Sequence, residues 1–383
     1  MEPVLFYVDH TARFERNTGI QRCVRCLSRA MLELGVPLQP VVWQRSHQTL
    51  EPASSQQRRH LARWQGPHPE QWMDSSSPRP AQVAAARWLV IPELVSGPYN
   101  PSADLLELEA KRRGLKVAWL FHDAIPVRWA HLYGQQAIPA AQAHIHYMRG
   151  LARFDRVIAN SHTTGEHLRQ FWKEQQLRPR AQICSVPLAE ECPGTQRLPA
   201  PTDSPESPLL LCVGSLEPRK NHRALLKALI ALCAEQQWPE KLTLVLAGWP
   251  NDAGVVEEVK RALQLDLPLR WESDADDDQL FKLYQDSIAC VYPSLEEGFG
   301  LPVAESLWHR RPCLCSNQGA LAELASGGGC LTLDTSCWQE LKKGLLTIST
   351  DIAVRNQLSA EITKRPQRTW HQVAREWIGM IGR

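Results

Sequence analysis

The sequence predicts an α/β protein built from two Rossmann-like domains, each with a parallel β-sheet. The chain has 383 residues, more than the roughly 250 to 300 residues that a single hydrophobic core can organise. Short apolar runs alternate along it with amphipathic stretches of helical length, and this alternation is typical of right-handed βαβ units. A proline-rich segment at residues 193–208 interrupts the alternation once and is predicted to be a linker between the domains.

The first domain is predicted to span residues 1–192. After a short apolar run, apolar positions recur at helical spacing from Gly19 to Leu34, which predicts a helix there. Residues 51–82 are rich in Gln, Ser, Pro and Arg and are expected to form a long surface loop. The predicted strands of this domain are the apolar runs at residues 4–8, 37–43, 87–94, 116–123, 156–161 and 182–188.

The second domain is predicted to span residues 209–365. Ligands of open α/β sheets bind beyond the carboxyl ends of the strands, so the loops that follow the strands are expected to line a central cleft that both sheets face. The predicted strands are residues 209–214, 242–248, 288–294, 312–316 and 330–333. The predicted helices are residues 222–237, 255–263, 278–285 and a helix that begins at Pro302.

The composition is that of a packed globular protein. Hydrophobic residues make up 43% of the chain and charged residues 22%, which excludes long disorder. No signal peptide or membrane anchor is expected, because no apolar stretch approaches the roughly 18 residues of a membrane span. The eleven cysteines are expected to be thiols of a cytoplasmic protein. Cys23 and Cys26 have the spacing of half a zinc site, but no matching second pair follows, so a helix is favoured over a metal site.

Positive charge is concentrated in the first part of the chain. Residues 1–200 contain 24 Lys and Arg against 17 Asp and Glu, a net charge of +7, and the remaining residues contain 19 against 24, a net charge of −5. We expect the basic clusters to face anionic phosphates or an anionic membrane surface, with an ordinary solvated face as the alternative. No nucleic-acid motif accompanies them, so no nucleic acid is expected as a partner. The clusters are Arg22, Arg25 and Arg29, and Lys111, Arg112, Arg113 and Lys116.

The motif VGSLEPRKN runs from a predicted strand through a turn into a predicted helix. Gly214 permits a tight exit from the strand, and Asn221 is a suitable N-cap for the helix. Arg219 and Lys220 place two adjacent cations at the turn. Adjacent cations often lie solvated on a surface, but this position after a strand of a doubly wound domain favours an anion-binding site.

The motif YPSLEEGFGLPVAES follows the strand at residues 288–294. Gly298 and Gly300 let backbone amides approach a ligand, and Pro302 suits the start of a helix whose positive end points at that ligand. Glu305 is expected on the first turn of this helix, where its carboxylate can accept both hydroxyls of a ribose. Glu297, eight residues earlier, can meet a sugar hydroxyl or a developing positive charge. The alternative is a helix start with acidic residues near its dipole.

These two motifs resemble those of the retaining glycosyltransferases of family 4. Their amino-acid sequences are similar to those of the mannosyl- and rhamnosyltransferase-like branch, which acts in bacterial polysaccharide and O-antigen biosynthesis. The resemblance extends through the second domain to WHQVAREW near the C-terminus. It implies the GT-B fold, in which two Rossmann-like domains face a central cleft. It also implies that residues 366–383 form a helix that crosses back to the N-terminal, acceptor-side domain.

The resemblance also implies roles for individual residues. Arg219 and Lys220 would bind the donor diphosphate, Glu305 the ribose hydroxyls, and Glu297 the transferred hexose. Gly19, in the loop that opens the first helix, would lie against the diphosphate from the other domain, and His122 would lie near the donor sugar. The donor would also be held by the backbone at Gly214, Gly298, Phe299 and Gly300.

The implied reaction transfers a hexose with retention from a nucleotide-sugar donor to a saccharide or lipid-linked saccharide acceptor. Mannose from GDP-mannose is the expected donor, and neither a cofactor nor a metal is expected. The acidic run Asp274, Asp276, Asp277 and Asp278 looks like a metal-binding motif, but it is better explained as the start of a helix. The expected location is cytoplasmic and peripheral at the inner face of the membrane. A sugar-nucleotide 2-epimerase of the same fold and a non-catalytic transferase-like subunit are the alternatives.

Overall fold

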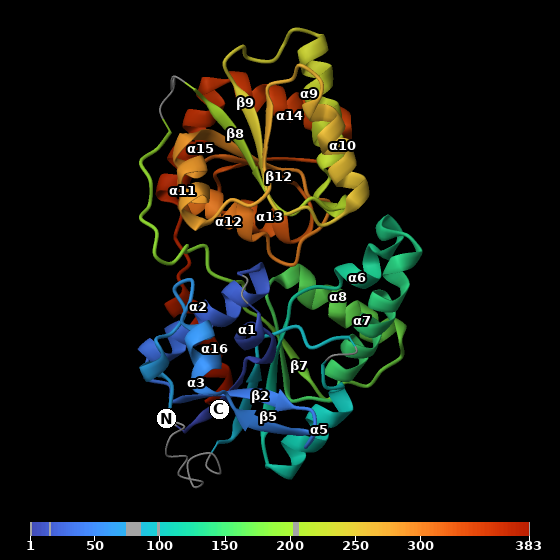
Figure 1. The fold of residues 1–383 in the computed structure, drawn as a ribbon, viewed down its shortest axis with the longest axis vertical. Helices are drawn as coiled ribbons and strands as arrows, with labels where there is room; N and C mark the ends of the chain where they lie inside the picture. The colour runs from blue at the N-terminus through green and yellow to red at the C-terminus, as the bar shows by residue number, and fades with distance from the viewer. Residues whose placement is uncertain (1, 15–16, 74–85, 98–99, 202–206, 383) are drawn as a thin grey trace. The chain divides into compact units, whose positions relative to one another are not determined.

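The computed structural model describes residues 2–14, 17–73, 86–97, 100–201 and 207–382. The chain divides into two compact units, each with one β-sheet that has helices on both faces (Figure 1). Unit 1 comprises Met1–Ala189 and Arg368–Arg383, and unit 2 comprises Glu190–Gln367. The prediction of two α/β domains with parallel sheets is confirmed. Residues 202–206 of the predicted linker lie outside the described residues.

The sheet of unit 1 has seven strands in the order β3-β2-β1-β4-β5-β6-β7. All neighbouring strands are parallel except β2 and β3, which pair antiparallel at the edge of the sheet. The central strands are buried on both faces, which explains why they are continuous apolar runs in the sequence. The strands are β1 (Val4–Tyr7), β2 (Leu38–Gln44), β3 (Thr49–Pro52), β4 (Trp88–Ile91), β5 (Lys116–Phe121), β6 (Arg156–Ala159) and β7 (Gln182–Ser185).

The helices of unit 1 include the predicted one at Gly19, which is α2. The prediction of a loop at residues 51–82 is wrong for its first part, because β3 ends there and α3 follows. Ser54 caps α3 in a reciprocal pair of hydrogen bonds with Gln57. Residues 74–82 of that segment lie outside the described residues. The helices are α1 (Asp9–Arg13), α2 (Gly19–Glu33), α3 (Ser55–Leu61), η1 (Pro69–Gln71), α5 (Ala103–Arg112), α6 (Ile125–Arg128), η2 (Ala130–Tyr133), η3 (Gln135–Ala137), α7 (Ile138–Leu151), α8 (His162–Glu174) and α16 (Trp370–Ile381).

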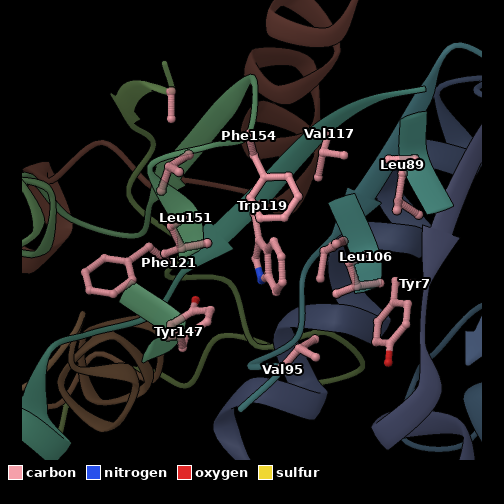
Figure 2. Close-up of a cluster of buried hydrophobic side chains, with 14 of the residues drawn as sticks. Tyr7, Leu89, Val95, Leu106, Val117, Trp119, Phe121, Tyr147, Leu151 and Phe154 are labelled. Atoms are coloured by element: carbon pink, nitrogen blue, oxygen red, sulfur yellow. The ribbon is translucent and has the colours of Figure 1, made fainter. Parts of the chain in front are cut away.

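The core of unit 1 is organised around Trp119 on β5 (Figure 2). The indole ring lies 5.1 Å from the ring of Phe154 and 5.7 Å from that of Tyr147, measured between centroids. Its Nε1 donates to the backbone oxygen of Glu93 at 3.2 Å, so burial leaves no polar atom of this side chain unsatisfied. This packing fixes the position of β5, and His122 directly follows that strand.

The C-terminal helix α16 belongs to unit 1 and packs against α2. Trp370 and Trp377 on α16 are almost completely buried, and His371 lies 3.0 Å from the carboxylate of Glu33 at the end of α2. Thr369 caps α16 at its N-terminus. The last sixteen residues thus complete the core of the unit that contains the N-terminus.

The sheet of unit 2 has six parallel strands in the order β10-β9-β8-β11-β12-β13. Five of these six strands were predicted from the sequence. The edge strand β10 was not predicted. Cys313 and Cys315 on β12 are buried free cysteines. The strands are β8 (Leu209–Val213), β9 (Thr243–Ala247), β10 (Leu269–Glu272), β11 (Ser287–Tyr292), β12 (Cys313–Ser316) and β13 (Cys330–Leu333).

In unit 2, α9 (His222–Ala234) follows the central strand β8, and α12 (Leu301–Trp308) follows the neighbouring central strand β11. Figure 1 shows α9, α10 and α14 on one side of the sheet and α11 and α12 on the other. The helices are η4 (Pro218–Lys220), α9 (His222–Ala234), α10 (Ala253–Leu263), α11 (Asp277–Asp286), α12 (Leu301–Trp308), α13 (Gly319–Ala325), α14 (Trp338–Thr350) and α15 (Ile352–Lys364). In the described part of the chain, no helix is long and apolar enough to span a membrane.

The two basic clusters of unit 1 are partly buried and partly paired with carboxylates. Arg25 on α2 is buried. On α5, Lys111 pairs with Glu107 at 2.6 Å, and Arg112 and Arg113 pair with Glu109 at 2.6 and 2.7 Å. The side chains of Lys111 and Arg112 are nevertheless more than half exposed, and their expected contact with an anionic surface stays a prediction.

Candidate functional site

The predicted donor-site residues of unit 2 meet at the carboxyl ends of β8 and β11, which are neighbours in the middle of the sheet. Gly214 ends β8, and its amide donates to the backbone oxygen of Ala247 on β9 at 2.9 Å. A Cβ atom at Gly214 would lie 3.7 Å from both Lys220 and Tyr292. A Cβ atom at Gly248 would lie only 2.0 Å from the backbone oxygen of Gly214, so the loops after β8 and β9 are in direct backbone contact.

Arg219 and Lys220 lie on the short helix η4 that follows β8. The guanidinium of Arg219 donates to Glu297 Oε1 at 2.6 Å and to Glu217 Oε1 at 2.9 Å. The ammonium of Lys220 donates to Glu297 Oε1 at 2.6 Å and also to the hydroxyl of Tyr292. Lys220 is buried, and burial lowers its pKa although Glu297 opposes the shift. Both cations therefore contact Glu297 directly.

Asn221 occupies the N-cap position of α9 but does not cap it with its side chain. Its backbone is left-handed, with φ at 59°, and its Nδ2 donates instead to the backbone oxygen of Thr335 at 2.7 Å. The predicted capping role is wrong. The residue turns the chain after η4 and ties it to the loop after β13, and asparagine tolerates this backbone conformation better than most residues.

Glu297 is the centre of the cluster. It lies in the loop after β11, is 9% exposed, and accepts hydrogen bonds from Ser294 at 2.6 Å and from Tyr292 at 2.8 Å in addition to those from Arg219 and Lys220. Burial alone would raise the pKa of its carboxyl, but the charges of Arg219 and Lys220 outweigh burial and hold the pKa at about 2. Glu297 is therefore ionised at neutral pH.

Two carboxylates compensate the two cations of this cluster. Glu217 and Glu297 are each within 2.9 Å of Arg219, and Glu297 is also 2.6 Å from Lys220. Both cations of the predicted anion-binding site are therefore already paired with carboxylates. An anionic ligand has to compete with these carboxylates for the same N–H groups.

The loop at Gly298, Phe299 and Gly300 leads from this cluster into α12. Gly300 is the N-cap of α12, with φ at 103°, and a Cβ atom there would lie 2.5 Å from the side chain of Leu321. Only glycine meets both conditions without strain. Phe299 is buried, so its ring is part of the core and only its backbone can face a ligand.

Glu305 lies on the second turn of α12 and not on the first, because the helix already begins at Leu301. It is buried, and its Oε2 accepts a hydrogen bond from the hydroxyl of Tyr284 on α11 at 3.2 Å. The structure thus places Glu305 in the same unit as the Arg219 cluster. Its predicted contact with a ribose stays a prediction.

The two other predicted residues, Gly19 and His122, lie in unit 1. Gly19 is the first residue of α2, whose N-cap Thr18 forms a reciprocal capping pair with Gln21, so Gly19 belongs to the helix and not to a loop. His122 is buried after β5, and its Nε2 donates to the backbone oxygen of Pro92 at 2.8 Å. Burial lowers its pKa, so the imidazole is neutral at pH 7 and presents Nδ1 as its acceptor.

The sequence motifs contained three further members of the cluster that their spacing did not single out. Tyr292 and Ser294 precede Glu297 by five and three residues, and Glu217 precedes Arg219 by two. All three have side chains hydrogen-bonded to the predicted residues. Their position at strand ends beside charged residues could have indicated that they belong to the site.

The acidic run at Asp276 begins α11, as predicted. Asp276 is the N-cap, and its carboxylate accepts from the amide of Gln279 at 2.8 Å while the Gln279 side chain accepts from the amide of Asp276. Asp277 and Asp278 lie in the first turn, near the positive end of the helix dipole. In the regions that the structure describes, no group of three or more His, Cys, Asp or Glu side chains has the arrangement of a metal site.

Comparison with known proteins relates unit 2 to a family of enzymes. Residues 196–365 match the family "Glycosyl transferases group 1". A segment of 120 residues is 36% identical to the O-antigen chain mannosyltransferase B of Escherichia coli and covers 31% of each chain. A segment of 187 residues is 28% identical to D-inositol 3-phosphate glycosyltransferase 2 of Catenulispora acidiphila and covers 47% of this chain and 44% of that one. The chain thus spans less than half the length of either curated relative.

The fold is similar to solved structures over the whole chain. Sucrose-phosphate synthase from Thermosynechococcus elongatus superposes with a TM-score of 0.68 at 15% identity, covering 100% of this chain and 98% of that one. The resemblance that the two sequence motifs carry is confirmed. The chain has the GT-B fold, its residues 196–365 match the group 1 glycosyl transferases, and a segment of it is similar to an O-antigen mannosyltransferase.

Proposed function

We propose that the chain is a retaining, metal-independent glycosyltransferase that transfers mannose from GDP-mannose to a saccharide or lipid-linked saccharide acceptor. The observation that carries the proposal is the convergence of Arg219, Lys220 and Glu297 at the carboxyl ends of β8 and β11. The O-antigen mannosyltransferase among its relatives supports mannose as the transferred sugar. In this proposal unit 2 binds the nucleotide sugar and unit 1 provides the acceptor side.

The charges of the cluster suit the breaking of a glycosyl phosphate bond. As the bond between the anomeric carbon and the phosphate oxygen breaks, the leaving diphosphate gains negative charge and the sugar gains positive charge. Arg219 and Lys220 would stabilise the diphosphate, and the ionised Glu297 would contact the hexose. Glu305 would hold the ribose, whose charge does not change during the reaction.

Retention requires the acceptor hydroxyl to attack from the face that the diphosphate leaves. The phosphate oxygen that departs can then take the proton of that hydroxyl, so the new glycosidic bond forms without a protein base. Gly19 and His122 are proposed to approach the donor from unit 1. A buried neutral imidazole such as that of His122 can accept a hydrogen bond from a sugar hydroxyl at Nδ1.

The test is a panel of nucleotide sugars, scored by nucleotide release and by the rise in Tm that each donor causes. GDP-mannose is expected to give the largest rise, and the Arg219→Ala variant is expected to lose it. Arg223→Ala is the matched control, because Arg223 is more than half exposed and pairs with Glu258 away from the cluster. Free epimers of the sugar nucleotide without acceptor would instead indicate an epimerase. Absence of both binding and turnover with every donor would indicate a non-catalytic subunit.

We further propose peripheral association with an anionic membrane, where a lipid-linked acceptor would lie. The net charge of +7 in residues 1–200 supports this. Flotation with vesicles that contain anionic lipid should capture the protein at low salt and release it at high salt. Equal capture by neutral vesicles would contradict the electrostatic attraction.

A further inference from the structure

Four donors converge on a single oxygen of Glu297. Arg219, Lys220 and Ser294 each lie 2.6 Å from Oε1, and Tyr292 lies 2.8 Å from it. Within the described residues, none of the hydrogen bonds of Glu297 is made to Oε2. An ionised carboxylate has about four acceptor positions shared between its two oxygens, so Oε1 has more donors than lone pairs.

The four donors are of two kinds. Arg219 and Lys220 are cations, and a diphosphate attracts them more strongly than it attracts neutral groups. Tyr292 and Ser294 are neutral hydroxyl donors on the end of β11 and in the loop that follows, and both are buried. When a diphosphate engages the two cations, the two hydroxyls are the donors that stay with Oε1.

The two hydroxyl groups are themselves held in place. The Tyr292 ring packs against the backbone at Gly214, where a Cβ atom would lie 3.7 Å from it. The backbone oxygen of Ser294 accepts from the hydroxyl of Thr335 at 3.2 Å, and the amide of Leu295 donates to the backbone oxygen of Arg219 at 2.8 Å. These contacts hold the ring that carries the Tyr292 hydroxyl and the backbone that carries the Ser294 side chain.

We propose that Tyr292 and Ser294 are positioning residues that hold the carboxylate of Glu297 by Oε1 after the donor diphosphate has drawn Arg219 and Lys220 away, so that Oε2 stays directed to the transferred sugar. This inference rests on the proposed function of the site. It assigns to two residues a role that acts through Glu297 and that needs no contact with the substrate. A purely structural role, in which the hydroxyls only satisfy a buried charge, would affect folding and leave the chemical step unchanged.

The test compares steady-state kinetics and Tm of Tyr292→Phe, Ser294→Ala and Ser294→Thr with GDP-mannose as the donor. Because a misplaced carboxylate affects the transition state more than donor binding, Tyr292→Phe and Ser294→Ala should each lower kcat by about tenfold or more while the donor KM changes by less than about threefold. Ser294→Thr keeps the hydroxyl and should restore most of kcat. In the Glu297→Gln background, neither Tyr292→Phe nor Ser294→Ala should lower kcat further, because both act through Glu297.

Tyr7→Phe is the matched control for deletion of a buried tyrosine hydroxyl. The Tyr7 hydroxyl has no hydrogen-bond partner among the described residues and lies in unit 1, so kcat and KM should both stay at wild-type values. The inference is overturned if Tyr292→Phe and Ser294→Ala lower only Tm, or if their effects add fully to that of Glu297→Gln. If the wild type and Arg219→Ala show no donor turnover or binding at all, the proposed function fails, and this inference fails with it.

Discussion

At the scale of single residues, we expect substitutions of Glu297 and Glu305 to have different kinetic effects. Glu297 contacts both cations, and the proposal places it at the reacting sugar, so Glu297→Gln and Arg219→Ala should lower kcat on the order of 10²-fold. Glu305 is placed at a ribose whose charge is constant, so Glu305→Ala should mainly raise the donor KM, by about 1 to 3 kcal/mol of lost binding. Initial-rate measurements over a range of donor concentrations separate the two effects. If Glu305→Ala lost kcat while Arg219→Ala kept the wild-type kcat, the proposed positions of the diphosphate and the ribose would be reversed.

A second residue-scale prediction concerns His222, which is the first residue of α9 and is buried beside Lys220. Neither ring nitrogen has a hydrogen-bond partner among the described residues, and burial, followed by the charge of Lys220, lowers its pKa to about 3. The unfolded chain takes up a proton near pH 6.5 whereas the folded chain does not, so the free energy of unfolding should fall as the pH drops from 6.5 toward 3.

His222→Leu should remove this part of the pH dependence and stabilise the protein, because it replaces a buried unsatisfied group by an apolar one. Chemical denaturation at pH 7 and pH 5 measures the effect. The exposed His47→Gln serves as the control and should keep the wild-type slope. An equal pH dependence in wild type and His222→Leu would show that the imidazole is protonated in the folded state.

The sequence predicted three charged members of the cluster and missed the fourth, Glu217, together with the neutral members. Arg219, Lys220 and Glu297 stand out because each follows a predicted strand of a doubly wound domain, where ligands bind. Tyr292 ends a continuous apolar strand, where an aromatic residue is ordinarily a core residue, and nothing in its spacing shows that its hydroxyl reaches Lys220. The compensation of Arg219 by Glu217 also requires the turn geometry of η4, which residue order alone does not give.

At the scale of elements, the start of α12 requires glycine at Gly300 for two reasons, its positive φ and the nearby side chain of Leu321. Gly300→Ala should destabilise the protein by about 1 to 3 kcal/mol, because the residue has φ at 103° and a Cβ atom would meet Leu321 at 2.5 Å. Gly379→Ala on α16 is the matched substitution, since a Cβ atom there meets nothing within 4 Å, and it should stabilise by about 0.5 kcal/mol. Urea denaturation measures both changes. Equal effects of the two substitutions would contradict the conformational argument.

Elements with strong apolar patterns were predicted well, and weakly buried ones were not. The central strands and α2 follow from apolar runs and from helical spacing that begins at Gly19. The edge strand β10 is only partly buried and has four residues, so its sequence lacks a continuous apolar run. The helix α3 is polar and short, although Ser54 and Gln57 provide the spacing of a capping box that could have indicated its start.

At the scale of the whole molecule, we expect turnover without a divalent metal. In the proposed function Arg219 and Lys220 would provide the positive charge at the diphosphate, and the acidic residue Asp276 caps α11. Activity should therefore be undiminished in excess EDTA. Complete loss of activity that manganese restores would contradict the prediction.

Calorimetric titration with GDP and with GMP measures whether the Arg219 and Lys220 cluster of unit 2 binds the diphosphate of a nucleotide donor, as we propose. GDP should bind at least about tenfold more tightly than GMP, because the second phosphate adds charge-assisted hydrogen bonds to the two cations. Arg219→Ala should lose this difference while Arg223→Ala keeps it. Equal affinity of the wild type for GDP and GMP, or a preference for GDP that survives in Arg219→Ala, would contradict the proposal.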